Sequence, residues 1–173
     1  MTTELIILVI VVLTALAFDF TNGFHDTANA MASSIATGAL KPKAAVALSA
    51  ILNLIGAFLS IEVAKTVGSG LIDLNTVDDG PSLMLIVFTG LVGAILWNVF
   101  TWLLGLPSSS SHALFGGLIG ATLASLGTNG VLWNGVLMKI LIPALMAPLI
   151  AGVVAGVGTA FIYRLTARVS EDQ

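Results

Sequence analysis

Polar side chains recur at regular intervals within an otherwise apolar segment near the N-terminus. They are Asp19, Asn22, Asp26, Asn29, Ser33 and Thr37. Successive steps of three or four residues place all of them on one face of an α-helix. An acidic side chain at the centre of a bilayer costs about 3 kcal/mol on insertion scales, so an intramembrane carboxylate marks a functional site by default. The stripe therefore predicts a transport pathway, with Asp26 as its main cation- or proton-coupling residue and Asn22 and Asn29 beside it.

A run of four serines follows a proline farther along the chain, in the sequence Gly105-Leu106-Pro107-Ser108-Ser109-Ser110-Ser111-His112. Proline cannot continue a helix without losing a hydrogen bond, so the preceding helix should end before it. Serine is a favoured N-cap, so a new helix should begin within the run. The free N–H groups and dipole of that helix, together with the serine hydroxyls, predict a site for an anion such as phosphate, sulfate or a carboxylate. The alternative is a capped helix start without a ligand.

The two histidines, His25 and His112, each adjoin one of these polar clusters. Imidazole titrates near neutral pH, so both are candidates for proton handling. One alternative is a metal site built from both histidines and Asp26, although their spacing is not diagnostic. Another is an intramembrane hydrolase, in which at most one of the earlier serines could pair with His112. The sequence contains nothing that resembles a nucleophile elbow, so a transporter is favoured over an enzyme.

The composition predicts that the chain lies in a lipid bilayer. Of its 173 residues, 57% are hydrophobic and 9% are charged, and the mean hydropathy is +1.07. Several segments approach the roughly 20 apolar residues needed to cross a bilayer. The formal charge of −3 provides no basic surface for nucleic acid. The absence of cysteine excludes disulfides, thiol catalysis and Cys-ligated metals.

Five hydrophobic segments are expected to form an all-α membrane protein. They cover residues 5–40, 44–63, 82–104, 111–126 and 140–163. The first would be about 54 Å long as one helix, which is too long for a straight span. Because glycine is a poor helix-interior residue, a break is predicted at Thr21-Asn22-Gly23, giving a broken span or a short re-entrant helix. Gly116 and Gly120 form a small-xxx-small pair that favours close helix packing.

Charge asymmetry predicts the orientation of these segments. Lys41, Lys43, Arg164 and Arg168 should be cytoplasmic, and the acidic loop at 73–79 should lie outside. The membrane domain is predicted to cover residues 1–163 and a cytoplasmic tail residues 164–173. Five crossings would insert a following copy of the unit in the opposite orientation, as in many secondary transporters. The chain is therefore expected to be one half of an inverted-repeat transporter.

Two motifs resemble those of the inorganic phosphate transporter (PiT) family, most closely its low-affinity bacterial members. The first is Asn22-Gly23-Phe24-His25-Asp26-Thr27-Ala28-Asn29-Ala30, and the second is the proline–serine run that ends at His112. The resemblance implies a fold of two inverted halves around a site at the middle of the membrane. It also implies that Asp26 and Asn29 are ion- and substrate-binding positions, and that Ser108 to Ser111 form the phosphate-binding turn. The wider family has Asn at the position of His25, and this difference points away from sodium coupling.

Resemblance to the bacterial branch implies a proton symporter of the cell membrane that carries phosphate by alternating access. The phosphate often travels as a neutral complex with a divalent metal, and no resident cofactor or metal is expected. The expected partners are phosphate, H⁺ or Na⁺, lipid, and a second repeat half or a further copy of the chain. The alternatives are sodium-coupled symport and a non-transporting membrane assembly protein.

Overall fold

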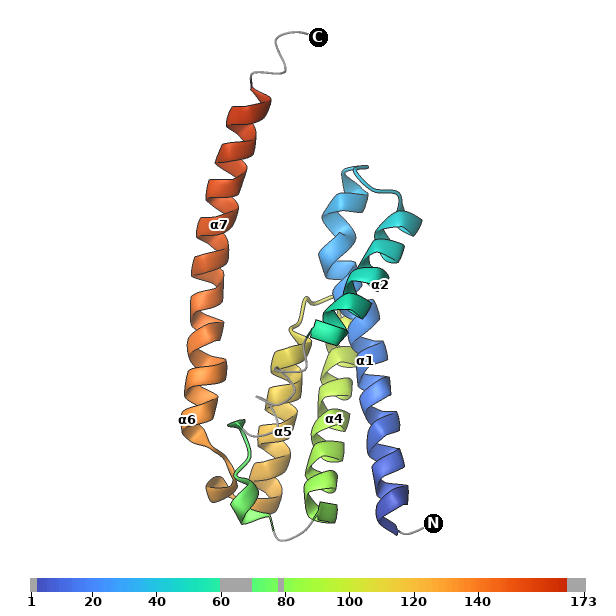
Figure 1. The fold of residues 1–173 in the computed structure, drawn as a ribbon, viewed down its shortest axis with the longest axis vertical. Helices are drawn as coiled ribbons and strands as arrows, with labels where there is room; N and C mark the ends of the chain where they lie inside the picture. The colour runs from blue at the N-terminus through green and yellow to red at the C-terminus, as the bar shows by residue number, and fades with distance from the viewer. Residues whose placement is uncertain (1–2, 60–69, 78–79, 168–173) are drawn as a thin grey trace. The chain divides into compact units, whose positions relative to one another are not determined.

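The computed structural model describes residues 3–59, 70–77 and 80–167. The chain divides into two compact units, Met1–Leu132 and Trp133–Gln173. Within the described residues the regular elements are helices (Figure 1), and β pairing is limited to an isolated antiparallel bridge between Ile72 and Val131. The prediction of an all-α fold is confirmed.

The first unit contains four α-helices that matter for the site: α1 (Thr3–Ala36), α2 (Pro42–Leu59), α4 (Gly80–Leu103) and α5 (Ser110–Leu126). Helix α4 packs against both α1 and α5, and α2 packs against α1. Figure 1 shows α1 and α4 running side by side in the same direction, with α5 returning beside α4. Their core is formed by Phe18, Leu91 and Ala94, with contributions from Ala113 and Leu114 of α5.

Helix α1 is continuous over 34 residues, so the predicted break at Thr21-Asn22-Gly23 is wrong. A glycine in a helix interior costs only about 1 kcal/mol relative to alanine, which is too little to interrupt a helix that packs on both sides of it. Phe18 lies in the core before the glycine and Phe24 contacts Trp102 after it, with a ring-centroid distance of 5.2 Å. The polar stripe therefore lies along one helix.

The boundaries around the serine run agree with the sequence. Helix α4 ends at Leu103, and Gly105 has a φ of 64°, which favours glycine. The backbone N–H groups of Gly105 and Leu106 donate to the carbonyls of Trp102 and Thr101 and so close the helix in a Schellman motif. Helix α5 then begins at Ser110 with Ser109 as its N-cap. The predicted end before Pro107 and the predicted start within the serines are both confirmed.

Close contact between α4 and α5 depends on two glycines. A Cβ atom placed on Gly117 would lie 2.2 Å from the carbonyl oxygen of Gly90, and one on Gly90 would lie 2.8 Å from Leu118. By contrast, a Cβ atom on Gly116 or Gly120 would meet nothing within 4 Å. The prediction that Gly116 and Gly120 are a close-packing pair is therefore wrong within the described residues. The four-residue spacing does place Gly116 and Gly120 on one face of α5, but the glycine of α5 that meets α4 is Gly117.

The second unit consists of α6 (Trp133–Val136), a π-helical turn (Leu137–Leu141) and α7 (Ile142–Thr166). Three helical segments are long and apolar enough to cross a membrane: Thr3–Ala36, Ser82–Leu103 and Trp133–Thr166. Two shorter apolar helices, Pro42–Phe58 and Ser110–Leu126, accompany them. These five segments correspond to the five predicted from the sequence. The predicted end of the second segment at residue 63 lies outside the described residues.

Candidate functional site

A hydrogen bond between Asp26 and Ser110 joins the polar stripe of α1 to the serine run at the start of α5. The hydroxyl of Ser110 donates to Oδ2 of Asp26 with an Oγ–Oδ2 distance of 3.0 Å. Ser110 is the first residue of α5 and is 6% exposed, whereas the Asp26 side chain is 48% exposed. The carboxylate thus receives a hydroxyl hydrogen at the positive end of the α5 dipole, which favours negative charge.

His25 lies next to this contact. Its side chain is buried, with 4% exposed, and its Nδ1 lies 3.5 Å from Oδ1 of Asp26. At that distance the interaction is at the outer limit of a hydrogen bond. The carboxylate therefore has a hydroxyl donor on one oxygen and an imidazole beside the other. This arrangement could move a proton to or from the carboxylate.

The other serines of the run point to different partners. Ser108 accepts a hydrogen bond from the indole Nε1 of Trp97 at 3.1 Å. The hydroxyl of Ser109 lies 2.7 Å from Nδ1 of His112 and also accepts from the backbone N–H of that residue at 3.4 Å. Ser111 is exposed. The structure brings Ser110 to Asp26, while Ser108, Ser109 and His112 lie together on another side of the α5 start.

These residues line a cavity of about 530 Å³ between α4 and α5. Its lining consists of Gly93, Trp97, Ser108, Ser109, His112, Ala113, Gly116 and Gly117. Because Ser109 already accepts the His112 backbone N–H, its hydroxyl hydrogen is available to Nδ1 of the same residue. The indole N–H of Trp97, which donates to Ser108, ties the serine run to α4.

Asn98 is a candidate that sequence reasoning missed. It is 1% exposed, and neither its Nδ2 nor its Oδ1 has a hydrogen-bond partner among the described residues. Helices α1 and α4 contact each other at Phe18 with Ala94 and again at Phe24 with Trp102. In this parallel pair, Asn22 and Asn98 fall at the level between those contacts. The Oδ1 of Asn22 is also buried without a partner, so each helix places an amide oxygen at that level.

The remaining polar residues of the first motif lie apart from Ser110. Asn29 is exposed, three residues beyond Asp26. Thr27 is hydrogen-bonded to Ser49 with an Oγ1–Oγ distance of 3.2 Å, and Asn53 donates to Ser49 at 3.3 Å. The first of these bonds joins α1 to α2. It gives the two hydroxyls a structural role at the face where these helices meet.

The two alternatives that used His112 gain no support from the geometry. Among the described residues, no three His, Asp or Glu side chains gather closely enough to hold a metal ion. Ser109 does pair with His112, as the spacing allowed, but the described hydrogen bonds of Asp26 lead to Ser110 and His25. A Ser–His–Asp relay therefore does not form from these residues.

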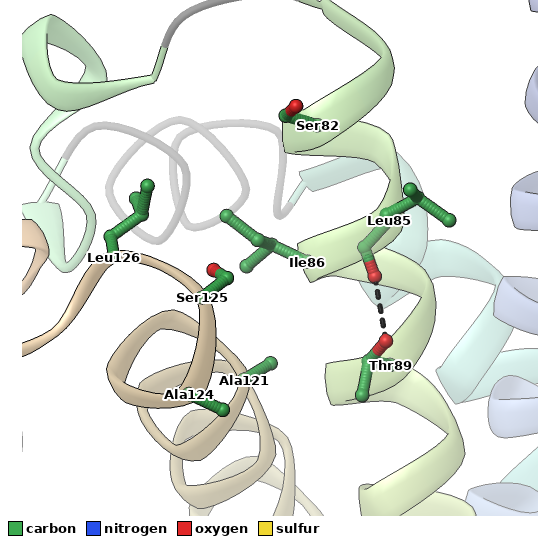
Figure 2. A pocket seen from close by; sticks show the side chains of 8 residues that line it. All are labelled: Ser82, Leu85, Ile86, Thr89, Ala121, Ala124, Ser125 and Leu126. Atoms are coloured by element: carbon green, nitrogen blue, oxygen red, sulfur yellow. Dashed lines mark hydrogen bonds between the residues drawn. The ribbon is translucent and has the colours of Figure 1, made fainter.

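A second cavity, of about 400 Å³, lies at the other end of the α4–α5 pair. Figure 2 shows its lining: Ser82, Leu85, Ile86, Thr89, Ala121, Ala124, Ser125 and Leu126. The hydroxyl of Thr89 donates to the carbonyl of Leu85 at 2.8 Å, so that hydrogen is used within α4 (Figure 2). The lining contains no charged side chain. The cavity offers little to orient an ion.

Comparison with known proteins extends over most of the chain. The model of the Phosphate transporter family matches residues 22–172. A probable low-affinity inorganic phosphate transporter of Mycobacterium tuberculosis is 61% identical over 173 residues, which is all of this chain and 40% of that protein. A protein of the same name from Streptomyces halstedii is 54% identical over 153 residues, covering 88% of this chain and 69% of its own length.

A solved structure is also similar. It is named the sodium-dependent phosphate transporter, and it superimposes with a TM-score of 0.77 at 26% sequence identity over 91% of this chain and 39% of its own. The chain thus spans about 40% of the length of the mycobacterial relatives. These relatives are transporters, which are not enzymes, in agreement with the expectation from the sequence. The apolar helices and the family match identify a multi-pass membrane protein, and the chain belongs to the phosphate transporter family.

Proposed function

We propose that this chain forms one half of a secondary-active transporter of inorganic phosphate, coupled to protons and working by alternating access. The observation that carries the proposal is the contact between Asp26 and Ser110, which joins a carboxylate to the hydroxyl-bearing start of α5. A site of this kind provides donors for an anion and a group that can carry a proton. The names of the relatives support phosphate as the anion.

Asp26, His25 and the first residues of α5 would form this half of the site. Ser108 to Ser111 would supply hydroxyl donors for phosphate, and Asn22, Asn29 and His112 would complete the polar surroundings. The second half of the site would come from another repeat or from a second copy of the chain in the cell membrane. A divalent metal would enter only as cargo, in a neutral complex with phosphate.

Proton coupling is supported by His25, whose imidazole lies beside the carboxylate. Imidazole exchanges protons near neutral pH, whereas an asparagine at this position would not. Sodium coupling is the second candidate, because the similar solved structure is named as sodium-dependent. The two candidates differ in what should drive uptake.

The test is uptake of radiolabelled phosphate into proteoliposomes that contain the chain alone or together with a candidate second half. At fixed membrane potential, an imposed pH step with the acid outside should drive uptake equally well in sodium and in choline buffers. His25→Asn should weaken or reshape the dependence on pH, and sulfate should compete poorly. Uptake that requires sodium and ignores the pH step would favour the second candidate. No uptake with any second half would reject transport.

A further inference from the structure

The chain places one of its own carboxylates at the anion-binding end of α5. Ser110 is the first residue of that helix, and its hydroxyl hydrogen is donated to Oδ2 of Asp26 at 3.0 Å. A serine hydroxyl has a single hydrogen to donate. While this hydrogen bond exists, Ser110 cannot donate to another anion. Asp26 therefore occupies the position that a phosphate oxygen would take at Ser110.

The ionised carboxylate would also repel an arriving phosphate. The described helices that pack around it carry few other charges: the sequence of α4 contains no charged or titratable residue, α5 contains only His112, and α2 contains only Lys43. On α1 itself the neighbouring titratable group is His25, with Asp19 and Glu4 farther toward the N-terminus. His112 is bound to Ser109, and Lys43 lies at the start of α2. Near Asp26 these helices place no lysine or arginine to offset the repulsion.

We propose that a proton and phosphate are coupled at this single hydrogen bond, because Asp26 competes with phosphate for Ser110 until it is protonated. The inference rests on the proposed function. When Asp26 takes up a proton, its new O–H can donate to the oxygen of Ser110. The Ser110 hydrogen then turns to a phosphate oxygen, and the negative charge of the carboxylate is removed. The only covalent bond that forms is the O–H of Asp26, and its proton remains there while phosphate is bound.

The competition is measurable because proton binding and phosphate binding at this site are thermodynamically linked. If phosphate binds well only when Asp26 is protonated, its apparent dissociation constant should rise up to tenfold for each pH unit over which that proton is lost. Phosphate binding should raise the proton affinity of the site by the same factor. His25 is placed to pass the proton, because its Nδ1 lies 3.5 Å from the second carboxylate oxygen.

Asp26→Asn tests the competition because it mimics the protonated side chain. The asparagine amide is neutral and can donate to the Ser110 oxygen, which frees the Ser110 hydrogen at every pH. Binding of radiolabelled inorganic phosphate should be measured between pH 4 and 8.5 in lipid nanodiscs that contain the full chain together with the second half used in the uptake test. At pH 8 the variant should bind at least ten times more tightly than the parent, and this ratio should fall as the pH is lowered. Titration of phosphate itself affects both proteins equally and cancels in this ratio.

Asp19→Asn is the matched control, because Asp19 is an exposed acid on the same helix, seven residues earlier. It should keep the pH dependence of the parent. In a Ser110→Ala background the gain from Asp26→Asn should shrink at least threefold. An equal gain in both backgrounds would overturn the shared hydrogen bond, and an identical pH dependence of parent and Asp26→Asn would overturn the competition. Both results would leave phosphate transport intact. If neither protein binds phosphate, the proposed function and this inference fail together.

Discussion

The hydroxyl of Ser110 donates to the carboxylate of Asp26 at 3.0 Å, across 84 residues of sequence. Asp26 belongs to the polar stripe of α1 and Ser110 begins α5. Two helices that are distant in sequence therefore meet through this polar contact. The donor is almost fully buried, and the carboxylate remains half exposed on its other side. This geometry leaves the carboxylate accessible to a proton while its partner is fixed.

Ser110→Ala should weaken phosphate binding. The substitution removes the hydroxyl that the protonated site would offer to phosphate, and loss of one charge-assisted hydrogen bond costs about 1–3 kcal/mol. Equilibrium binding of phosphate measures the change. Ser125→Ala is the control, because Ser125 is an exposed serine on the same helix, near its other end. Equal affinities for the two variants would leave Ser110 with a packing role alone.

Asp26→Asn should abolish net phosphate uptake in proteoliposomes, even though it is expected to retain phosphate binding. A neutral side chain cannot carry the coupled proton through the transport cycle. Insertion and thermal stability should be unchanged or improved, because removing a carboxylate from a low-dielectric site does not harm folding. Uptake and melting temperature should be measured on the same preparation. Uptake near the rate of the parent protein would reject Asp26 as the coupling residue.

The helix boundaries next to the serine run could be predicted from neighbouring residues, whereas features that depend on tertiary packing could not. Pro107 and the serine N-cap act within a few residues, so the end of α4 and the start of α5 could be placed from the sequence. The continuity of α1 could not, because the small penalty of Gly23 is outweighed by contacts on both sides of it. Propensity alone gives no measure of those contacts.

The choice of Ser110 among four serines also depends on packing. Adjacent helical residues point about 100° apart, so the rotation of α5 decides which hydroxyl faces α1. Nothing in the run itself sets that rotation. The close approach of Gly117 to Gly90 does set it, but the sequence alone does not show that Gly117 makes this contact and neighbouring Gly116 does not. Asn98 carried a usable signal, because it is a strongly polar side chain in an apolar segment.

Gly117→Ala should destabilise the first unit of the chain. Its Cβ atom would lie 2.2 Å from the carbonyl oxygen of Gly90, which is backbone and cannot move aside without separating α4 from α5. Overpacking typically costs about 1–3 kcal/mol, and a backbone neighbour places this site at the upper end. Thermal unfolding in detergent provides the measurement. Gly116→Ala is the neighbouring control and should be neutral or stabilising, since alanine is the better helix former and nothing lies within 4 Å. Equal melting temperatures for the two variants would contradict the packing described here.

Asn98→Leu should lower phosphate uptake without lowering the stability of the chain. The wild-type amide is 1% exposed with neither polar atom paired among the described residues, and leaving a buried polar group unpaired costs about 1–3 kcal/mol. Leucine has a similar size and no polar atom, so the melting temperature should stay the same or rise. Phosphate uptake should nevertheless fall if the buried amide, at the level of Asn22 and about one helical turn from Asp26, contributes to the site. Asn53→Leu is a useful comparison, since that asparagine is already bonded to Ser49 on α2. Its loss should lower stability and leave the dependence of uptake on pH unchanged. If Asn98→Leu raised stability and left uptake untouched, the buried amide would have no part in transport.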